Sequence, residues 1–177
     1  MARTILTYGI ISGLIVILWA IFGFNFSYGG SLSFLSVWMG YLTMLLVLSS
    51  IFVAIKRYRD VHQGGVITFG TGLLVGLGIA ATAGVVYVAV WEIYLFATEY
   101  VFIDHYTQSI IEARRAAGAS DADMSTLVAE MEKMKAQYGN PLYRLPMTFL
   151  EIFPVGLIIS LISATILRRS EILSANS

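Results

Sequence analysis

The sequence contains no cysteine, which excludes disulfides, iron–sulfur clusters and thiolate metal sites. Charged residues make up only 12% of the 177 positions, about half of the share found in soluble domains. The formal net charge is zero, so there is no overall basic field to attract nucleic acid. No catalytic, metal or nucleotide motif stands out. The function must therefore be argued from a small number of polar residues.

Apolar residues, by contrast, are abundant: they account for 58% of the chain, and the mean hydropathy is +0.79. They gather in four stretches, at about residues 5–24, 35–55, 68–96 and 147–167. Crossing a membrane takes roughly 20 helical residues. We therefore predict an all-α fold, in which residues 1–177 form a single integral membrane domain built as a four-helix transmembrane bundle. The first stretch is longer than a signal-peptide core and ends in no small-x-small cleavage site, so we expect an uncleaved helix.

The positions of the basic residues predict the orientation of the spans. Short loops and chain ends on the cytoplasmic side of a membrane protein are enriched in Lys and Arg. The turn at residues 25–30 carries no charge, and the long 99–146 segment has more acidic than basic residues. We therefore expect both termini to be cytoplasmic and 99–146 to be extracytoplasmic. The basic residues that fall on the opposite side from the uncharged turn are Arg3, Lys56, Arg57, Arg59, Arg168 and Arg169.

The 99–146 segment contains signals for two helices. Ser120 and Asp123 match a capping box, apolar residues then recur at helical spacing up to Met134, and Gly139 followed by Asn140-Pro141 is a stop signal. Residues 100–117 are predicted to be a helical continuation of the third span. Joined around Gly118, the two segments predict an extracytoplasmic helical hairpin between the third and fourth spans. Such a hairpin either buries its own apolar stripe, against itself or the bilayer surface, or docks a partner protein.

Four blocks of the sequence resemble a known family. They are IFVAIKRYRD (51–60), GGVITFGTG (64–72), VWEIY (90–94) and NPLYRLPMTFLEIFPVGLIIS (140–160), the last continuing to Arg169. Together they are similar to the bacterial membrane-protein family catalogued as domain of unknown function 4199. The resemblance covers nearly the whole chain. It implies a bacterial inner-membrane protein with four spans, and it supplies no reaction, ligand or site residue.

Small residues recur every fourth position in the third span, at Gly72, Gly76, Ala80 and Gly84. Such a ridge lets another helix approach closely. The fourth span has a matching row in Gly156, Ser160 and Ala164, and the first span has Gly9 and Gly13. We interpret these rows as helix-packing surfaces. The alternative, a nucleotide or lipid-phosphate site, lacks the strand and βαβ unit that a phosphate-binding loop needs.

Two carboxylates, Glu92 and Glu151, lie within predicted spans, each about four residues from the outer end. An ionised acid at mid-membrane costs about 2.5–3.5 kcal/mol, so such groups tend to face the bundle interior and to have partners. Three hypotheses remain open. The acids are structural and bond a neighbouring helix or Arg144; they form a proton or cation site at a shared depth; or they are a paired-acid enzyme site. Pro154, one turn below Glu151, interrupts the helical hydrogen bonds there.

The two histidines, His62 and His105, are predicted on opposite sides of the membrane, so no two-histidine metal site is expected. We expect no cofactor and no enzymatic activity. The leading interpretation is a non-enzymatic accessory, assembly or scaffolding component. The alternative is a small oligomeric carrier or channel that uses Glu92 and Glu151. The expected partners are the lipid bilayer and either further copies of the chain or another membrane protein, with no nucleic acid.

Overall fold

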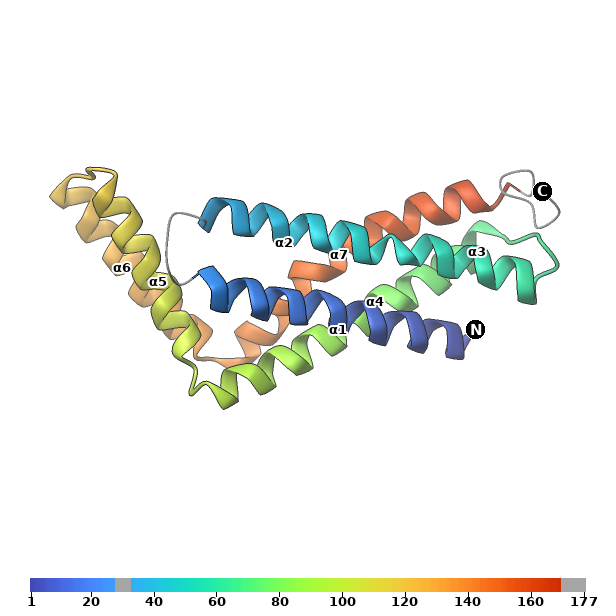
Figure 1. Cartoon of the computed structure of the whole chain (residues 1–177), viewed down its shortest axis with the longest axis horizontal. Coiled ribbons are helices and arrows are strands. Elements are labelled where there is room, and N and C mark those ends of the chain that lie inside the picture. Colours follow the sequence, from blue (N-terminus) through green and yellow to red (C-terminus); the bar gives the residue numbers. More distant parts are fainter. Residues whose placement is uncertain (28–32, 170–177) are drawn as a thin grey trace. The chain divides into compact units, whose positions relative to one another are not determined.

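The computed structural model describes residues 1–27 and 33–169, and over these ranges it is helical without any strand (Figure 1). Within them lie four helical stretches long and apolar enough to cross a membrane: Ala2–Phe24, Trp38–His62, Phe69–Ala97 and Pro141–Leu167. The predicted all-helical fold class is confirmed, and the four stretches indicate a multi-pass membrane protein. The helices are α1 (Ala2–Ser27), α2 (Ser33–Leu48), α3 (Ser50–His62), α4 (Phe69–Ala97), α5 (Val101–Ala116), α6 (Asp121–Tyr138) and α7 (Pro141–Leu167).

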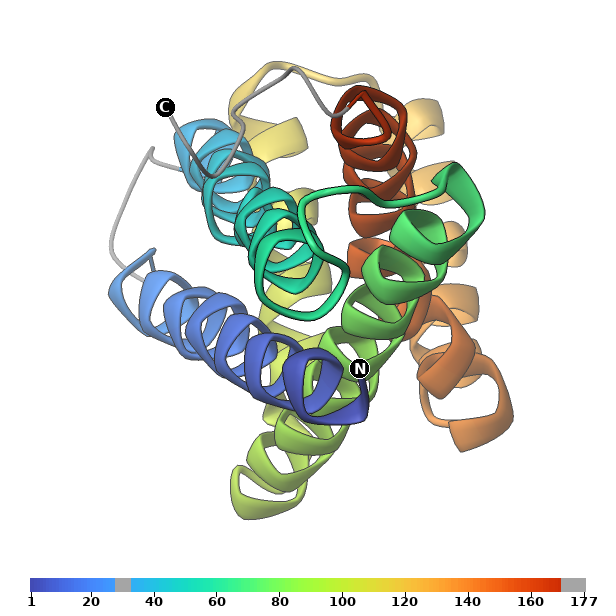
Figure 2. The same cartoon turned by 90° about the vertical axis from the view of Figure 1, so that its right-hand side faces the viewer.

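The chain divides into two compact units. The first consists of Met1–Val90 and Phe149–Ser177, and the second of Trp91–Thr148. In the first unit α1 contacts both α2 and α3, and the helices run side by side in the end-on view of Figure 2. Ile17, Leu48, Ile51, Val75 and Ile79 are fully buried and form the core.

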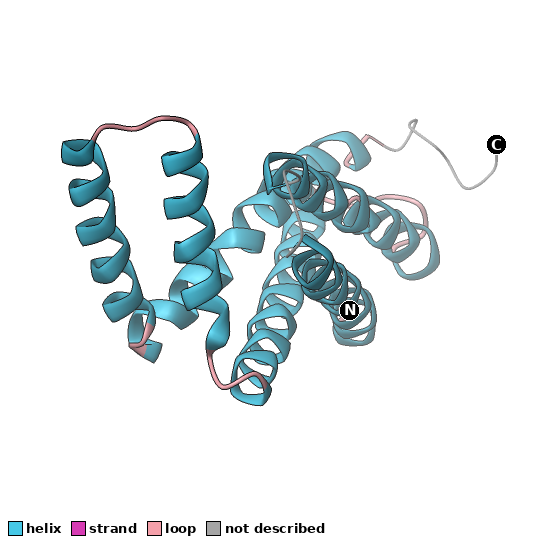
Figure 3. Cartoon of the chain, turned by 60° about the vertical axis from the view of Figure 1, so that its left-hand side comes forward, coloured by secondary structure: helices cyan, strands magenta, loops and turns pink. Residues whose placement is uncertain are grey.

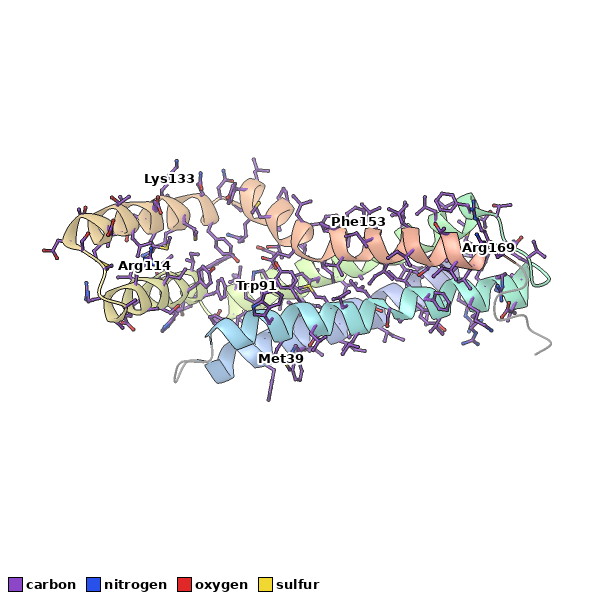
Figure 4. The ribbon with its side chains drawn as sticks, turned by 90° about the horizontal axis from the view of Figure 1, so that it is seen from above. Met39, Trp91, Arg114, Lys133, Phe153 and Arg169 are labelled. Carbon is purple, nitrogen blue, oxygen red and sulfur yellow. The ribbon has the colours of Figure 1, made fainter. Side chains whose placement is uncertain are left out.

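The outer faces of the first unit remain apolar. Leu18 on α1 is 58% exposed and Leu46 on α2 is 66% exposed. Met39 projects away from α2 in Figure 4. Soluble proteins rarely leave so much apolar surface uncovered, whereas lipid solvates it without cost.

The small residues of α4 and α7 lie directly against each other in the first unit. A Cβ atom added at Gly76 would stand 2.7 Å from Ser160, and one at Gly156 would stand 2.6 Å from Ala80. At Gly72 the nearest atom belongs to Ala164, at 3.4 Å. The two helices are therefore antiparallel at this contact, and successive small residues of α4, four positions apart, face successive small residues of α7 in reverse order. The two backbones approach as closely as the predicted packing ridge requires.

Helix α1 packs closely against another face of α4 through two of its glycines. An added Cβ would stand 2.5 Å from Thr82 at Gly9, and 2.7 Å from the carbonyl oxygen of Ala83 at Gly13. Between these glycines, the hydroxyl of Ser12 is hydrogen-bonded to that of Ser50 on α3 at 3.0 Å. The first unit is therefore assembled through close backbone approach, together with the Ser12–Ser50 hydrogen bond between α1 and α3.

The second predicted span, 35–55, differs from the structure at both its middle and its end. Ser49 interrupts the helix between α2 and α3, and its hydroxyl donates to the carbonyl of Leu46 at 2.6 Å, a local bond that competes with regular helical bonding. The helix then continues through the basic residues to His62. Lys56 pairs with Asp60 one turn later at 2.8 Å, which supports the helix beyond Ile55. It ends before Gly64 and Gly65, both at positive φ.

Helix α7 begins at Pro141, six residues before the predicted start of the fourth span at Met147. The side-chain oxygen of Asn140 accepts a hydrogen bond from the backbone N–H of Leu142 at 3.0 Å. Asn140 thereby caps the new helix, and Pro141 occupies its first turn, where a missing N–H costs nothing. The sequence Gly139-Asn140-Pro141, which predicted the end of α6, therefore also marks the start of α7.

In the second unit, α5 and α6 lie side by side and are joined by residues 117–120 (Figure 3). Ser120 caps α6 as predicted, since its hydroxyl oxygen accepts from the N–H of Asp123 at 3.2 Å. Lys135 pairs with Asp104 across the two helices at 2.7 Å, whereas Lys133 points away from the ribbon in Figure 4. The position of this helix pair outside the membrane stays a prediction.

The prediction that residues 100–117 continue the third span was wrong. Helix α4 ends at Ala97, and Glu99 and Tyr100 adopt left-handed conformations with φ of 53° and 60°. The N–H of Tyr100 donates back to the carbonyl of Leu95 at 2.8 Å, closing the helix end. No glycine occurs in this turn, so no local sequence signal predicted it.

Candidate functional site

The strongest polar contact of the second unit joins Glu92, near the end of α4, to Arg144, in the first turns of α7. Arg144 Nε donates to Glu92 Oε1 and Nη2 donates to Oε2, both at 2.7 Å. This is the bidentate geometry in which a planar guanidinium matches a carboxylate. Arg144 is buried, and Glu92 is about one quarter exposed. The pairing is one of the alternatives that the sequence left open.

Arg144 is held by further groups of the same unit. Its Nη1 donates to the backbone carbonyl of Tyr138 at 2.8 Å. The guanidinium carbon stands 5.1 Å from the ring centre of Tyr100 and 5.6 Å from that of Tyr138, within range of cation–π attraction. The Nε1–H of Trp91 donates to the Tyr138 hydroxyl at 2.8 Å. We call Trp91, Glu92, Tyr100, Tyr138 and Arg144 the Arg144 cluster.

The Arg144 cluster draws together two stretches of the chain that are distant in sequence, residues 91–100 and residues 138–144. Its members come from the end of α4, the left-handed turn that follows, the end of α6 and the start of α7. Phe102 on α5 extends it, because its ring meets Trp91 edge-on at 4.8 Å. Sequence reasoning identified Glu92 and Arg144 but missed the three aromatic residues. The spacing of these aromatic residues in the sequence carries no signal that they meet Arg144.

A cavity of about 200 Å³ adjoins the cluster within the second unit. Both cations at its wall are already paired, Arg144 with Glu92 and Lys135 with Asp104. The hydrogen bond to Asp104 raises the pKa of Lys135. That pair therefore stabilises the fold below the ordinary lysine pKa, and the stabilisation is lost as pH rises through the raised value. The cavity is lined by Tyr100, Ile103, Lys135, Tyr138, Gly139, Pro141 and Arg144.

The second intramembrane acid, Glu151, belongs to the first unit. Its Oε2 accepts a hydrogen bond from the hydroxyl of Tyr87 on α4 at 3.1 Å. Tyr87 is buried, whereas the Glu151 side chain is exposed at the protein surface. Glu92 and Glu151 thus lie in different units and have different partners. Their shared depth in the membrane, on which a common site depends, stays a prediction.

The predicted packing residues Gly72, Gly76, Ala80, Gly156 and Ser160 all lie at the α4–α7 contact of the first unit. Gly84 also faces α7, where an added Cβ would stand 2.5 Å from the ring of Phe149. Ser160 is buried, and its hydroxyl donates to the carbonyl of Gly156 at 2.6 Å, so it presents no free polar group to a ligand. Among the described residues, no three His, Asp or Glu side chains gather in a way that could hold a metal ion.

Arg59 is a buried cation, whereas the sequence analysis identified it only as one of the basic residues that flank the second span. It is fully buried in the first unit, and its Nε donates to Asp60 Oδ1 at 2.7 Å. Its Nη1 reaches the carbonyl of Leu167 at 3.4 Å, at the last residue of α7. Positive charge near a helix C-terminus is favourable, so Arg59 fastens the end of α7 to α3.

No curated protein and no solved structure is similar to the chain at a significant level. The family model described as "Protein of unknown function (DUF4199)" matches residues 7–169, which include all seven helices in whole or in large part. The chain therefore belongs to the DUF4199 family.

Proposed function

We propose that this protein is a non-enzymatic accessory, assembly or scaffolding component of a bacterial inner membrane, with both termini cytoplasmic. The observation that carries the proposal is the Arg144 cluster. Both oxygens of Glu92 and three nitrogens of Arg144 are engaged in bonds within the protein. These bonds join residues 91–100 to residues 138–144, and this structural use of the two charges supports a non-enzymatic role.

Affinity purification tests the proposal. The tagged full-length chain is extracted in mild detergent, and co-purifying proteins are identified and quantified by mass spectrometry. A scaffold or accessory subunit should retain a partner at stoichiometric ratio, which an unrelated four-span protein with the same tag does not retain. A stable homo-oligomer without such a partner contradicts the proposal and favours the carrier or channel.

A second function, a small oligomeric carrier or channel, is favoured by Glu151. This carboxylate lies within a candidate span, is exposed on the surface of its unit, and has the single hydroxyl of Tyr87 as its hydrogen-bond donor among the described residues. An exposed acid at that position is costly in lipid unless water or another copy of the chain covers it. Oligomerisation around Glu151 would give it such a polar surrounding.

Flux measurements separate the two functions. In proteoliposomes, Glu151→Gln should abolish pH- or cation-dependent flux and keep the fold if Glu151 forms an ion pathway. If the acid is structural, the same substitution lowers thermal stability, and wild type and variant show the same background flux. Tyr87→Phe is the matched control, because it removes the same hydrogen bond and leaves the carboxylate in place.

A further inference from the structure

A cavity of about 360 Å³ lies in the first unit where the start of α1 meets the end of α3. It is distinct from the Arg144 cluster, which belongs to the second unit. The two helices that form it are in contact and are joined deeper in the unit by the Ser12–Ser50 hydrogen bond. The cavity is lined by Arg3, Thr4, Thr7, Tyr8, Arg57, Tyr58, Val61 and His62.

The lining of this cavity, which we call the α1–α3 pocket, contains cations without a counter-charge. Arg3 and Arg57 form no ion pair or hydrogen bond within the described part of the chain. The nearest acid in the sequence, Asp60, is already engaged by Lys56 at 2.8 Å and Arg59 at 2.7 Å. None of the described residues that line the pocket carries a carboxylate. Its charge is therefore positive and available to an anion.

The other polar groups of the pocket suit a phosphate. Thr4, Thr7 and Tyr8 place hydroxyl donors on α1, and His62 adds a ring N–H from α3. A guanidinium can donate two parallel hydrogen bonds to a phosphate, which makes two arginines facing one cavity a stronger anion site than two lysines. Hydroxyl and imidazole donors can bind the remaining phosphate oxygens.

The surface below the pocket is apolar. Ile11 lies one helical turn deeper on α1 than Thr7, and Val53 lies one turn deeper on α3 than Arg57. Both are more than half exposed, at 52% and 54%. Arg57 is five residues from the end of its span at His62, a rise of about 8 Å, which matches the depth of lipid headgroups. A phosphate in the pocket would thus have an uncovered apolar track beneath it for attached acyl chains.

From this geometry we propose that the α1–α3 pocket binds the phosphate group of an anionic phospholipid, with Arg3 and Arg57 as its ligands. The proposal is independent of the scaffold function. Basic pockets between membrane helices are a recognised form of headgroup site. The free phosphate group of a soluble ester shares the same chemistry, so the experiment includes it.

The test measures lipid retention and thermal stability of the purified full-length chain in mild detergent. The probes are phosphatidylglycerol, cardiolipin, phosphatidylcholine and inorganic phosphate. Wild type should retain the two anionic lipids in native mass spectrometry and be stabilised by them, with little effect of phosphatidylcholine. Arg3→Gln/Arg57→Gln should weaken anionic-lipid binding about 30-fold, at roughly fivefold for each charge near the surface.

Two further variants keep the test decisive. Arg168→Gln/Arg169→Gln removes the same charge from exposed residues that do not line the pocket, and it should bind lipid like wild type. Thr7→Trp fills the pocket without changing charge and should weaken binding as the double arginine variant does. Stabilisation by inorganic phosphate alone, lost in the Arg3/Arg57 variant, would assign the site to a soluble phosphate ester. If both double variants lose anionic-lipid binding equally, or if neither loses it, the α1–α3 pocket is not the headgroup site.

Discussion

A single side chain, Arg144, contacts several segments of the second unit at once. It combines a bidentate ion pair, a backbone hydrogen bond and two aromatic neighbours in a buried position. Burying a guanidinium is costly, and only full pairing offsets the cost. We therefore expect the second unit to be sensitive to changes in the partners of Arg144.

Removing its counter-charge should be strongly destabilising. Glu92→Gln leaves a buried cation without its partner, and we expect the free energy of unfolding to fall by about 2–4 kcal/mol. Thermal unfolding in detergent, followed by circular dichroism, measures the loss. Lys135→Gln is the control, because it breaks a more exposed pair and should cost much less stability than Glu92→Gln. If the two variants lose equal stability, the cluster is not a structural centre.

At the scale of elements, the left-handed turn between α4 and α5 is the least favourable piece of local backbone. Two consecutive non-glycine residues, Glu99 and Tyr100, have positive φ, at about 1–2 kcal/mol each. The ring of Tyr100 packs beside the Arg144 guanidinium, which helps to fix the turn. Glu99 has no such compensating contact among those observed.

Glycine at position 99 should relieve this strain. We expect Glu99→Gly to stabilise the protein by about 0.5 kcal/mol, since the conformational gain exceeds the added entropy of the unfolded chain. Glu130→Gly, in the exposed interior of α6, should instead cost about 1 kcal/mol. A differential scanning measurement on both variants checks the opposite signs. A destabilised Glu99→Gly variant would show that the turn is held by contacts of the glutamate.

The α4–α7 contact gives a second prediction for the elements. Gly76→Leu should push Ser160 away and lower the free energy of unfolding by roughly 1–3 kcal/mol. Gly70→Leu is its control, because an added Cβ there meets no described atom within 4 Å. Unchanged thermal stability and oligomer size in Gly76→Leu would refute the packing argument.

Much of the element order could be predicted from local signals. Uncharged apolar runs marked the spans, and Ser120 with Asp123 marked the start of α6 because capping depends on neighbours in sequence. The interruption at Ser49 and the turn at Glu99 depend on packing and had no glycine or proline to announce them. The Glu92–Arg144 pair also depends on packing, so from the sequence it was one of several hypotheses for the acid. The aromatic partners of Arg144 were not predicted. Side chains separated by many residues meet only once the fold exists.

At the scale of the whole molecule, the prediction concerns the side of the membrane on which each segment lies. We predict that Ser125→Cys reacts with a membrane-impermeant thiol reagent on cells stripped of their outer membrane, and that Gln63→Cys does not. Both positions are exposed in the structure, and the chain has no native cysteine to interfere. A membrane-permeant reagent should label both, which controls for accessibility. The reverse labelling pattern would invert the topology.

The four-residue rhythm of the α4–α7 contact also limits how this pair of helices can move. Ser160 and Ala164 rest over glycines, and Gly156 rests under Ala80, so each side chain occupies a notch of the opposing backbone. A slide that keeps such a fit must advance by a whole repeat, about 6 Å along the axis. Intermediate positions would place Ser160 over backbone without a notch to receive it. The contact therefore holds the two helices in one register against displacements smaller than a repeat.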